Sequence, residues 1–158
     1  MKVGIDLLHF ATSDFYMGLD TFAKEKGTEV EKYTIGIGQD KMSIAPPDED
    51  VVTLSAKACA PILQQINPQE ITAILFATET GVDQSKSAGV FLHGLLNLAK
   101  NCRVIELKHA CYSGAAGVQM ATAMVRANPK EKILVIAADI AKYDVDTSGE
   151  ATQGCGAV

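Results

Sequence analysis

The sequence predicts an α/β protein with a mostly parallel sheet and helices on both faces of that sheet. Segments of strand character alternate with segments of helical spacing along the 158 residues, which is the order of parallel strands joined by right-handed crossovers. Two strand segments, ITAILFA at 71–77 and KILVIAA at 132–138, are apolar almost throughout. Such runs are typical of strands buried on both faces, whereas half-exposed strands alternate apolar and polar residues.

The N-terminal third is expected to hold two strands and one helix. The apolar run at 3–8 predicts the first strand, and residues 15–26 have helical spacing. Gly27 is a natural end for that helix because glycine is favoured just past a helix C-terminus. A second, short strand is predicted at 32–37, and the two prolines within 41–49 indicate a loop.

A long helix, a buried strand and a second helix are expected in the middle of the chain. The apolar residues of 50–66 fall near one stripe of a helix, and Pro61 predicts a kink or an early end there. The strand at 71–77 comes next, and residues 87–98 are again helical.

The last third continues the same alternation. Residues 103–107 predict a strand, 112–127 predict a helix rich in small residues, and 132–138 predict another strand. A further apolar strand begins at GCGAV, where the sequence stops with nothing to cover it. We therefore expect residues 1–158 to form one α/β region that is incomplete at its C-terminal end.

Composition excludes several classes of function. The formal net charge of −5 argues against a nucleic-acid partner, because binding to phosphates requires a basic surface. No apolar run is long enough to cross a membrane and no signal peptide is evident, so a cytoplasmic protein is expected. The four cysteines show no spacing of metal ligands, so no metal site is predicted. Three of them, Cys59, Cys102 and Cys155, are expected to be small packing residues.

Cys111 is the main candidate for a reactive residue. It lies between the strand at 103–107 and the helix at 112–127, next to the positive end of that helix. The first backbone N–H groups of a helix have no partner within the helix, and they favour a neighbouring anion. Such a position favours the thiolate form, which is the nucleophile needed to carry an acyl group.

Glu79 is the second candidate, because it directly follows the stretch ITAILFAT, which contains the buried strand at 71–77. Active sites of open α/β sheets gather outside the carboxyl ends of the strands, and Cys111 also follows such an end. We therefore expect the two side chains to be neighbours, with Glu79 as a general base and then an acid. The alternative is that Glu79 only caps or solvates a loop.

A histidine and a glycine-rich segment are two further candidates for the site. His109 lies two residues before Cys111, which in an extended segment is too far for a direct hydrogen bond to the thiol. The segment SGEATQGCGAV at 148–158 has glycines that permit close backbone approach, and Ser148 and Thr152 can donate hydrogen bonds to an acyl group. An ordinary turn explains this segment equally well.

Five stretches of the sequence share their order and spacing with one enzyme family. They are IGIGQDKM, FATETGVDQSKSAGVFLHGLL, ELKHACYSGAAGVQMA, KILVIAADIAKYD and SGEATQGCGAV. They closely resemble bacterial 3-hydroxy-3-methylglutaryl-CoA synthases of the mevalonate pathway. The resemblance covers only about the first half of a family member. It implies a thiolase-like fold made of two similar α/β halves and assembled as a homodimer.

The resemblance also implies an activity and roles for particular residues. The family condenses acetyl-CoA with acetoacetyl-CoA, its partners in the reaction, and needs no cofactor beyond these CoA thioesters. Cys111 matches the cysteine that becomes acetylated, and Glu79 matches the general acid/base. Thr152 matches a residue near the bound acyl group, and Tyr143 and Ser148 match positions in the substrate pocket.

One catalytic residue of the family has no counterpart in this sequence. The histidine that binds and polarises acetoacetyl-CoA comes from the second half of the fold, and none of His9, His93 and His109 matches it. The isolated 158-residue chain is therefore expected to be inactive. Two other interpretations stay open: a polyketide β-branching synthase that acts on an acyl carrier protein, and a non-catalytic half of a composite fold.

Overall fold

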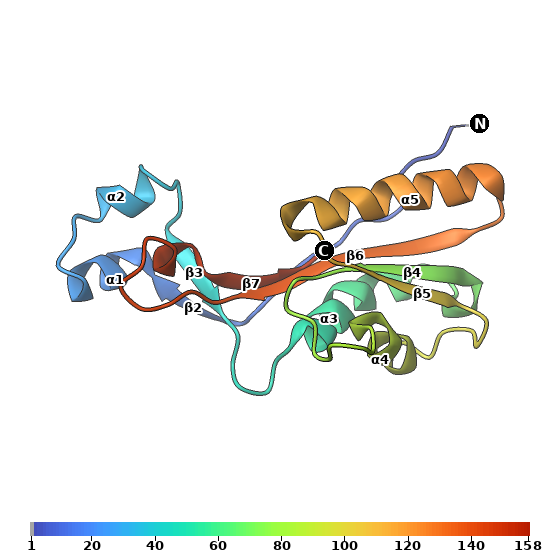
Figure 1. Cartoon of the computed structure of the whole chain (residues 1–158), viewed down its shortest axis with the longest axis horizontal. Coiled ribbons are helices and arrows are strands. Elements are labelled where there is room, and N and C mark those ends of the chain that lie inside the picture. The colour runs from blue at the N-terminus through green and yellow to red at the C-terminus, as the bar shows by residue number, and fades with distance from the viewer. Residues whose placement is uncertain (1) are drawn as a thin grey trace.

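The computed structural model of the chain describes residues 2–158 (Figure 1). Within these residues a five-stranded sheet has the order β1-β7-β6-β4-β5, and β2 and β3 form a separate two-stranded sheet. The strands are β1 Ala11–Thr12, β2 Phe15–Gly18, β3 Lys41–Ile44, β4 Ile71–Ala77, β5 Arg103–Leu107, β6 Lys132–Ala141 and β7 Gly154–Ala157. The α-helices are α1 Leu19–Glu25, α2 Glu31–Thr34, α3 Val51–Leu63, α4 Ala88–Leu95 and α5 Ser113–Ala127.

Three parallel strands, β6, β4 and β5, form one side of the larger sheet. β4 pairs in parallel with both β5 and β6, so that Leu75 lies opposite Ile105 on one side and Val135 on the other. Figure 1 shows α5 on one face of this sheet and α3 and α4 on the other, where they pack against β4, β5 and β6. β4 is buried along nearly its whole length, as expected for a strand covered on both faces. The predicted α/β fold with a mostly parallel sheet is confirmed.

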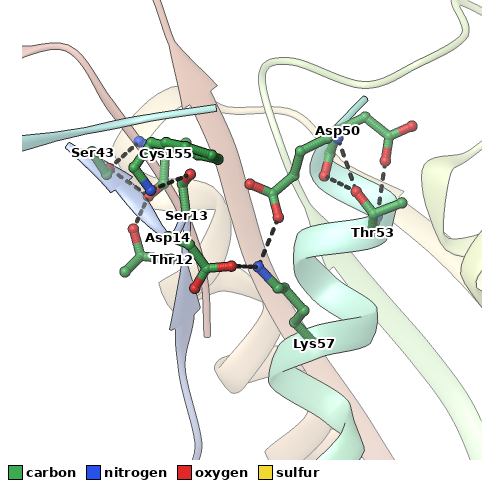
Figure 2. Close-up of polar contacts among 10 residues, drawn as sticks. Thr12, Ser13, Asp14, Ser43, Asp50, Thr53, Lys57 and Cys155 are labelled. Atoms are coloured by element: carbon green, nitrogen blue, oxygen red, sulfur yellow. Dashed lines mark hydrogen bonds and ion pairs between the residues drawn. The ribbon is translucent and has the colours of Figure 1, made fainter. Parts of the chain in front are cut away.

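Helix α3 begins where the sequence predicts and ends at Leu63, before the predicted boundary at residue 66. Asp50 Oδ1 accepts hydrogen bonds from the N–H groups of Val52 and Thr53, while the Asp50 N–H donates to Thr53 Oγ1 (Figure 2). This reciprocal pair satisfies donors that the first turn of a helix otherwise leaves free. The helix runs through Pro61 but ends soon afterwards at Leu63, because proline supplies no N–H donor to the turn before it.

The predicted first strand at 3–8 is wrong in this structure. Residues 2–10 belong to no strand, and pairing with β7 begins only at Ala11. Three large apolar side chains of this segment, Ile5, Leu8 and Phe10, are between 68% and 72% exposed. The physical reason is that a strand needs a neighbour for its backbone, and no described residue pairs with this part of the chain.

Three other predictions in the N-terminal third also need correction. The helix predicted at 15–26 begins only at Leu19, because β2 occupies its first residues and pairs antiparallel with β3. β3 itself lies in the segment predicted as loop at 41–49. The strand predicted at 32–37 is instead the single turn α2. In α2 the buried Tyr33 ring contacts the Phe22 ring edge-on at 5.5 Å, so tertiary packing overrides the strand propensity of this segment.

A second apolar cluster lies apart from the sheet and defines an arm of the molecule. We use the name arm for residues 15–44, which include β2, α1, α2 and β3, together with residues 142–153. Figure 1 shows these segments together at one end. Its buried apolar residues are Leu19, Phe22, Ala23, Tyr33, Met42 and Ala151. The helix α1 ends before Gly27, whose φ of +60° suits glycine, as predicted from the sequence.

Hydrogen bonds to Cys155 join the arm to the main sheet. Ser43 Oγ accepts from the Cys155 N–H at 2.7 Å and donates to the Cys155 carbonyl at 2.8 Å (Figure 2). Thr12 Oγ1 donates to the same carbonyl at 2.8 Å. Cys155 lies on β7 and is buried, as expected of a packing residue.

Candidate active site

The two candidate catalytic residues lie at the same edge of the sheet. Glu79 follows the carboxyl end of β4, and Cys111 lies in a 3₁₀ turn, Ala110–Tyr112, between β5 and α5. β4 and β5 are neighbouring parallel strands, so the segments that follow them emerge side by side. The position of both segments agrees with the expectation for open α/β sheets.

A direct hydrogen bond connects the two segments. Glu79 Oε1 accepts from the backbone N–H of Ala110 at 2.6 Å, and Ala110 is the residue directly before Cys111. Ala110 has a φ of +44°, a left-handed conformation that costs a non-glycine residue about 1–3 kcal/mol. The carboxylate therefore helps to hold a strained backbone in the conformation that presents the cysteine.

The turn before α5 is also closed by Ser113. The Ser113 hydroxyl is buried and accepts a hydrogen bond from the His109 N–H. Close packing of α5 on the sheet follows from its small residues, since a Cβ on Gly117 would lie 3.0 Å from Val135 Cγ1. Cys111 is thereby fixed at the start of a helix whose first N–H groups lack helical partners.

Cys111 differs from the other cysteines in its exposure. It is exposed, whereas Cys59, Cys102 and Cys155 are buried, as predicted for packing residues. Burial raises the pKa of the Cys59 thiol to about 12 and also raises the pKa of Cys102. These thiols stay protonated near neutral pH, so a thiol-directed reagent has access mainly to Cys111.

Asp139 organises the loop that carries Glu79, and the sequence analysis missed it. Its Oδ1 accepts from the N–H groups of Glu79 at 2.8 Å and Thr80 at 3.0 Å. The same oxygen accepts from the hydroxyls of Thr78 at 3.1 Å and Thr80 at 2.8 Å. The signal available in the sequence was one carboxylate inside the otherwise apolar run KILVIAADIA. Its partners lie about 60 residues away, so local pattern could not identify them.

The rest of this loop is fixed by two more carboxylates. Asp83 Oδ1 accepts from the N–H groups of Lys86 and Ser85, both at 2.7 Å, and these bonds lower the pKa of Asp83. Glu106 on β5 accepts from the Ala88 N–H at 2.6 Å, at the first turn of α4. Negative charge at this end of a helix is favourable. The loop from Glu79 to α4 is therefore held at its start, middle and end.

The three predicted substrate-binding residues lie on the segment between β6 and β7. Thr152 Oγ1 donates to the Gly149 carbonyl at 2.7 Å, and the Tyr143 ring lies against the Gly149 backbone. Ser148 is exposed in the turn between Tyr143 and Thr152. Among the described residues, no hydrogen bond or ion pair joins any of the three to Cys111 or Glu79.

The histidines lie in different surroundings. The His109 ring contacts the Tyr112 ring edge-on at 5.5 Å, and no hydrogen bond within the described residues joins it to Cys111. His93 lies on α4, and its Nε2 atom is 3.0 Å from the Ala99 carbonyl oxygen. His9 lies in the segment outside any strand.

In the described part of the chain, no helix is both long and apolar enough to span a membrane.

Comparison with known proteins gives consistent matches over the whole chain. The family described as "Hydroxymethylglutaryl-coenzyme A synthase N terminal" matches residues 1–158. The hydroxymethylglutaryl-CoA synthase of Enterococcus faecalis is 40% identical over 100% of this chain and 41% of that protein. The polyketide biosynthesis 3-hydroxy-3-methylglutaryl-ACP synthase PksG of Bacillus subtilis is 32% identical over 96% of this chain and 37% of that protein.

A solved structure is similar in the same region. The structure of MvaS in complex with 3-hydroxy-3-methylglutaryl coenzyme A superposes with a TM-score of 0.92 and 36% identity. The match covers 99% of this chain and 40% of that chain.

The fold is therefore that of a thiolase-like protein. The turn that carries Cys111 and the loop that carries Glu79 lie at one edge of its sheet. The chain belongs to the hydroxymethylglutaryl-CoA synthase family and matches its N-terminal part. It spans about two fifths of the length of the relatives it matches, which are 41% and 37% covered.

Proposed function

We propose that the chain is the N-terminal part of an acyltransferase that condenses acetyl-CoA with acetoacetyl-CoA to give 3-hydroxy-3-methylglutaryl-CoA. One observation carries the proposal. The Glu79 carboxylate accepts a hydrogen bond from the residue before Cys111, which places a carboxylate beside an exposed thiol. Family membership, and the ligand named for the similar structure, support CoA thioesters as the substrate class.

The reaction would use the two side chains in sequence. The Cys111 thiolate attacks the carbonyl of acetyl-CoA, and CoA leaves and is protonated to its thiol. Glu79 then removes a proton from the acetyl methyl group, and the carbanion equivalent attacks the ketone carbon of acetoacetyl-CoA. The new alkoxide takes that proton back from Glu79. Water finally hydrolyses the cysteine thioester, which releases the product and restores the thiol.

The segment between β6 and β7 would contribute to substrate binding. Thr152, Tyr143 and Ser148 lie beyond the same sheet edge, where the antiparallel pair of β6 and β7 extends past β4. In this proposal they contact the acyl group or the adjoining part of the CoA thioester. No metal or prosthetic group takes part, because the thioester is itself activated for attack.

The remaining parts of the proposal concern the whole protein. A mevalonate-pathway role, a cytoplasmic location and a homodimer are supported by the family resemblance of this chain. The polarising histidine and the rest of the substrate channel would come from the remainder of the family's length. The 158 residues alone would then accept an acetyl group without completing the condensation.

Substitutions at the two residues test the proposed roles in a full-length protein that carries these 158 residues. Cys111→Ser should abolish acetyl-enzyme formation from acetyl-CoA, because a hydroxyl is almost fully protonated near neutral pH. Glu79→Ala should leave acetylation intact and lower condensation by about 10²–10⁴-fold. Acetyl-enzyme is measured by intact mass, and condensation by loss of acetoacetyl-CoA.

Glu29→Ala, which removes an exposed carboxylate in the arm, is the matched control and should retain both steps. Normal condensation by Glu79→Ala would contradict the base assignment. If Cys111→Ser still formed acetyl-enzyme, the assignment of Cys111 as the residue that carries the acetyl group would be wrong.

A second candidate function differs only in the acceptor. The similarity to PksG favours a synthase that acts on acyl groups bound to a carrier protein. The two candidates are distinguished by comparing the turnover rate with acetoacetyl-CoA to the turnover rate with an acetoacetyl carrier protein. We expect a preference for the CoA substrate, since the identity to the Enterococcus faecalis enzyme is higher. A strong preference for the carrier protein would favour the alternative.

A further inference from the structure

The side chain of Thr80 joins the loop that carries Glu79 to β6. Its Oγ1 donates a hydrogen bond to Asp139 Oδ1 at 2.8 Å and accepts one from the Ile140 N–H at 3.0 Å. Asp139 and Ile140 are consecutive residues of β6, so one hydroxyl contacts both the side chain and the backbone of that strand. Thr80 directly follows Glu79 in the chain, so this double contact lies one residue from the candidate base.

The contact lies where the backbone pairing of β4 and β6 stops. The last paired residues of these two strands are Ala77 and Ala137. On its other side β6 pairs antiparallel with β7, where Ala137 and Val158 exchange hydrogen bonds. Residues of such a ladder alternate between exchanging bonds and facing away, so the N–H of Ile140, three residues further on, points away from β7. It points to the side of β4, beyond the end of that strand, and accepts the Thr80 hydroxyl as its partner.

The Thr80 hydroxyl therefore continues the link between β4 and β6 after the backbone pairing has ended. Thr78 supports the other side of Glu79, because its buried hydroxyl donates to the same oxygen of Asp139 at 3.1 Å. The chain is thus attached to β6 on both sides of Glu79. From there the Glu79 carboxylate reaches the Ala110 N–H at 2.6 Å. Loss of the Thr80 attachment would free one side of Glu79 and with it the direction of the carboxylate.

We propose that Thr80 is a positioning residue for Glu79, whose hydroxyl holds the Glu79 carboxylate at the cysteine turn during carbon–carbon bond formation. This inference rests on the proposed function, in which Glu79 removes a proton from the acetyl methyl group. Thr80 acts through Glu79 and takes no part in the proton transfer itself. The base must lie within hydrogen-bond reach of its proton, and a misplacement of about 1 Å lowers a rate by about 10²-fold. Acetylation of Cys111 does not use this base, so it should not depend on Thr80.

Two substitutions at Thr80 test this role in a full-length protein that carries these 158 residues. Thr80→Val keeps the branched shape but removes both the donor to Asp139 and the acceptor for Ile140. The kcat of condensation should fall at least about tenfold, while the KM for acetoacetyl-CoA and the rate of acetylation stay unchanged. Thr80→Ser keeps the hydroxyl and should retain the rate. A kcat for Thr80→Val within about twofold of the unsubstituted protein would overturn the proposal.

Thr72→Val is the matched control, because the Thr72 hydroxyl also joins β4 to β6. Thr72 Oγ1 donates to the Lys132 carbonyl at 3.1 Å, at the opposite end of β4 from Glu79. This variant loses a comparable hydrogen bond between the same two strands and should condense at the unsubstituted rate. An equal fall of kcat in Thr72→Val and Thr80→Val would overturn the proposal, because the effect would then come from weaker attachment of the strands in general.

Glu79→Ala separates a failure of this inference from a failure of the proposed function. If Thr80 acts through Glu79, adding Thr80→Val to Glu79→Ala should not slow the residual condensation further. A further loss as large as that of Thr80→Val alone would overturn the positioning role. A normal rate in Thr80→Val beside a large loss in Glu79→Ala would overturn the role of Thr80 and leave the proposed function intact. Normal condensation by Glu79→Ala would overturn the base assignment and this inference together.

Discussion

At the residue scale, the candidate site depends on a chain of hydrogen bonds that runs from Asp139 to the cysteine turn. Asp139 fixes the backbone of Glu79, and the Glu79 carboxylate in turn fixes the strained Ala110. Each link joins segments that are far apart in the sequence. The position of Cys111 is therefore set by residues on β4 and β6 as well as by its own helix.

Removal of the Asp139 carboxylate should loosen this arrangement. Asp139→Ala leaves the N–H groups of Glu79 and Thr80 without their acceptor, so the free energy of unfolding should fall by about 1–3 kcal/mol. Asp139→Asn retains a neutral acceptor, so its free energy of unfolding should lie between those of the unsubstituted chain and Asp139→Ala. Urea unfolding measures the free energy of unfolding, and hydrogen exchange at the Glu79 and Ala110 amides measures how firmly the loop is held.

Asp144→Ala, at an exposed position between β6 and β7, is the control for loss of one negative charge. It should leave both the stability and the exchange rate at Ala110 unchanged. Identical behaviour of Asp139→Ala and Asp144→Ala would show that Asp139 does not position the Glu79 loop.

At the scale of single elements, glycines set how closely the helices approach the sheet. In α4, a Cβ on Gly89 would lie 2.7 Å from Val104 Cγ1 and 3.3 Å from Phe76 Cβ. A Cβ on Gly94 of the same helix would meet no atom within 4 Å. One helix thus contains a glycine required by packing and another that packing does not require.

The two glycines should respond oppositely to the same substitution. Gly89→Ala should lower the free energy of unfolding by about 1–3 kcal/mol, because the added methyl group overpacks the contact with β4 and β5. Gly94→Ala should raise it by about 0.5–1 kcal/mol, because alanine loses less backbone entropy in a helix. Urea unfolding of the two variants provides the comparison. Stabilisation by Gly89→Ala would contradict the packing distances.

At the scale of the whole molecule, the structure consists of a sheet with its helical layers and an arm with its own small core. An ion-pair cluster lies within the arm, where Lys26 Nζ contacts Asp146 at 2.7 Å and Glu150 at 2.9 Å. The hydrogen bonds to Asp146 and Glu150 raise the pKa of Lys26. The hydrogen bond from Lys26, and a second from the Asp146 N–H, lower the pKa of Glu150.

The arm should therefore depend on pH through this cluster. Folding lowers the pKa of Glu150. The stability that its carboxylate contributes is therefore present above pH 4.5, the ordinary pKa of the group, and is lost as the pH falls through the lower pKa of the folded state. Folding raises the pKa of Lys26. The stability that its ammonium group contributes is therefore present below pH 10.5, its ordinary pKa, and is lost as the pH rises through the higher pKa of the folded state. At pH 7, Lys26→Met should accelerate hydrogen exchange at the Asp146 amide relative to the unsubstituted chain.

This difference between Lys26→Met and the unsubstituted chain should disappear in acid, once Glu150 is protonated. Lys24→Met, which removes an exposed lysine of the same helix, should have no such effect at either pH. A difference that persisted unchanged in acid would assign the effect to the lysine stem rather than to its charge.

The parallel sheet, the helices from residue 51 onward and the common edge of Glu79 and Cys111 could all be predicted from the sequence. These features follow from local apolar pattern and from the rule that neighbouring parallel strands end on one side. The exposure of Cys111 and the burial of the other three cysteines also agree with that pattern.

Features that depend on distant partners could not be predicted and became visible only in the folded chain. Asp139 gained its role from donors about 60 residues away, and α2 formed where Tyr33 packs on Phe22. Residues 3–8 have strand composition but no strand, because β-structure requires a neighbouring backbone that the described residues do not supply. Helical periodicity can be recognised within one segment, whereas a strand or a buried carboxylate is defined by the segment that it meets.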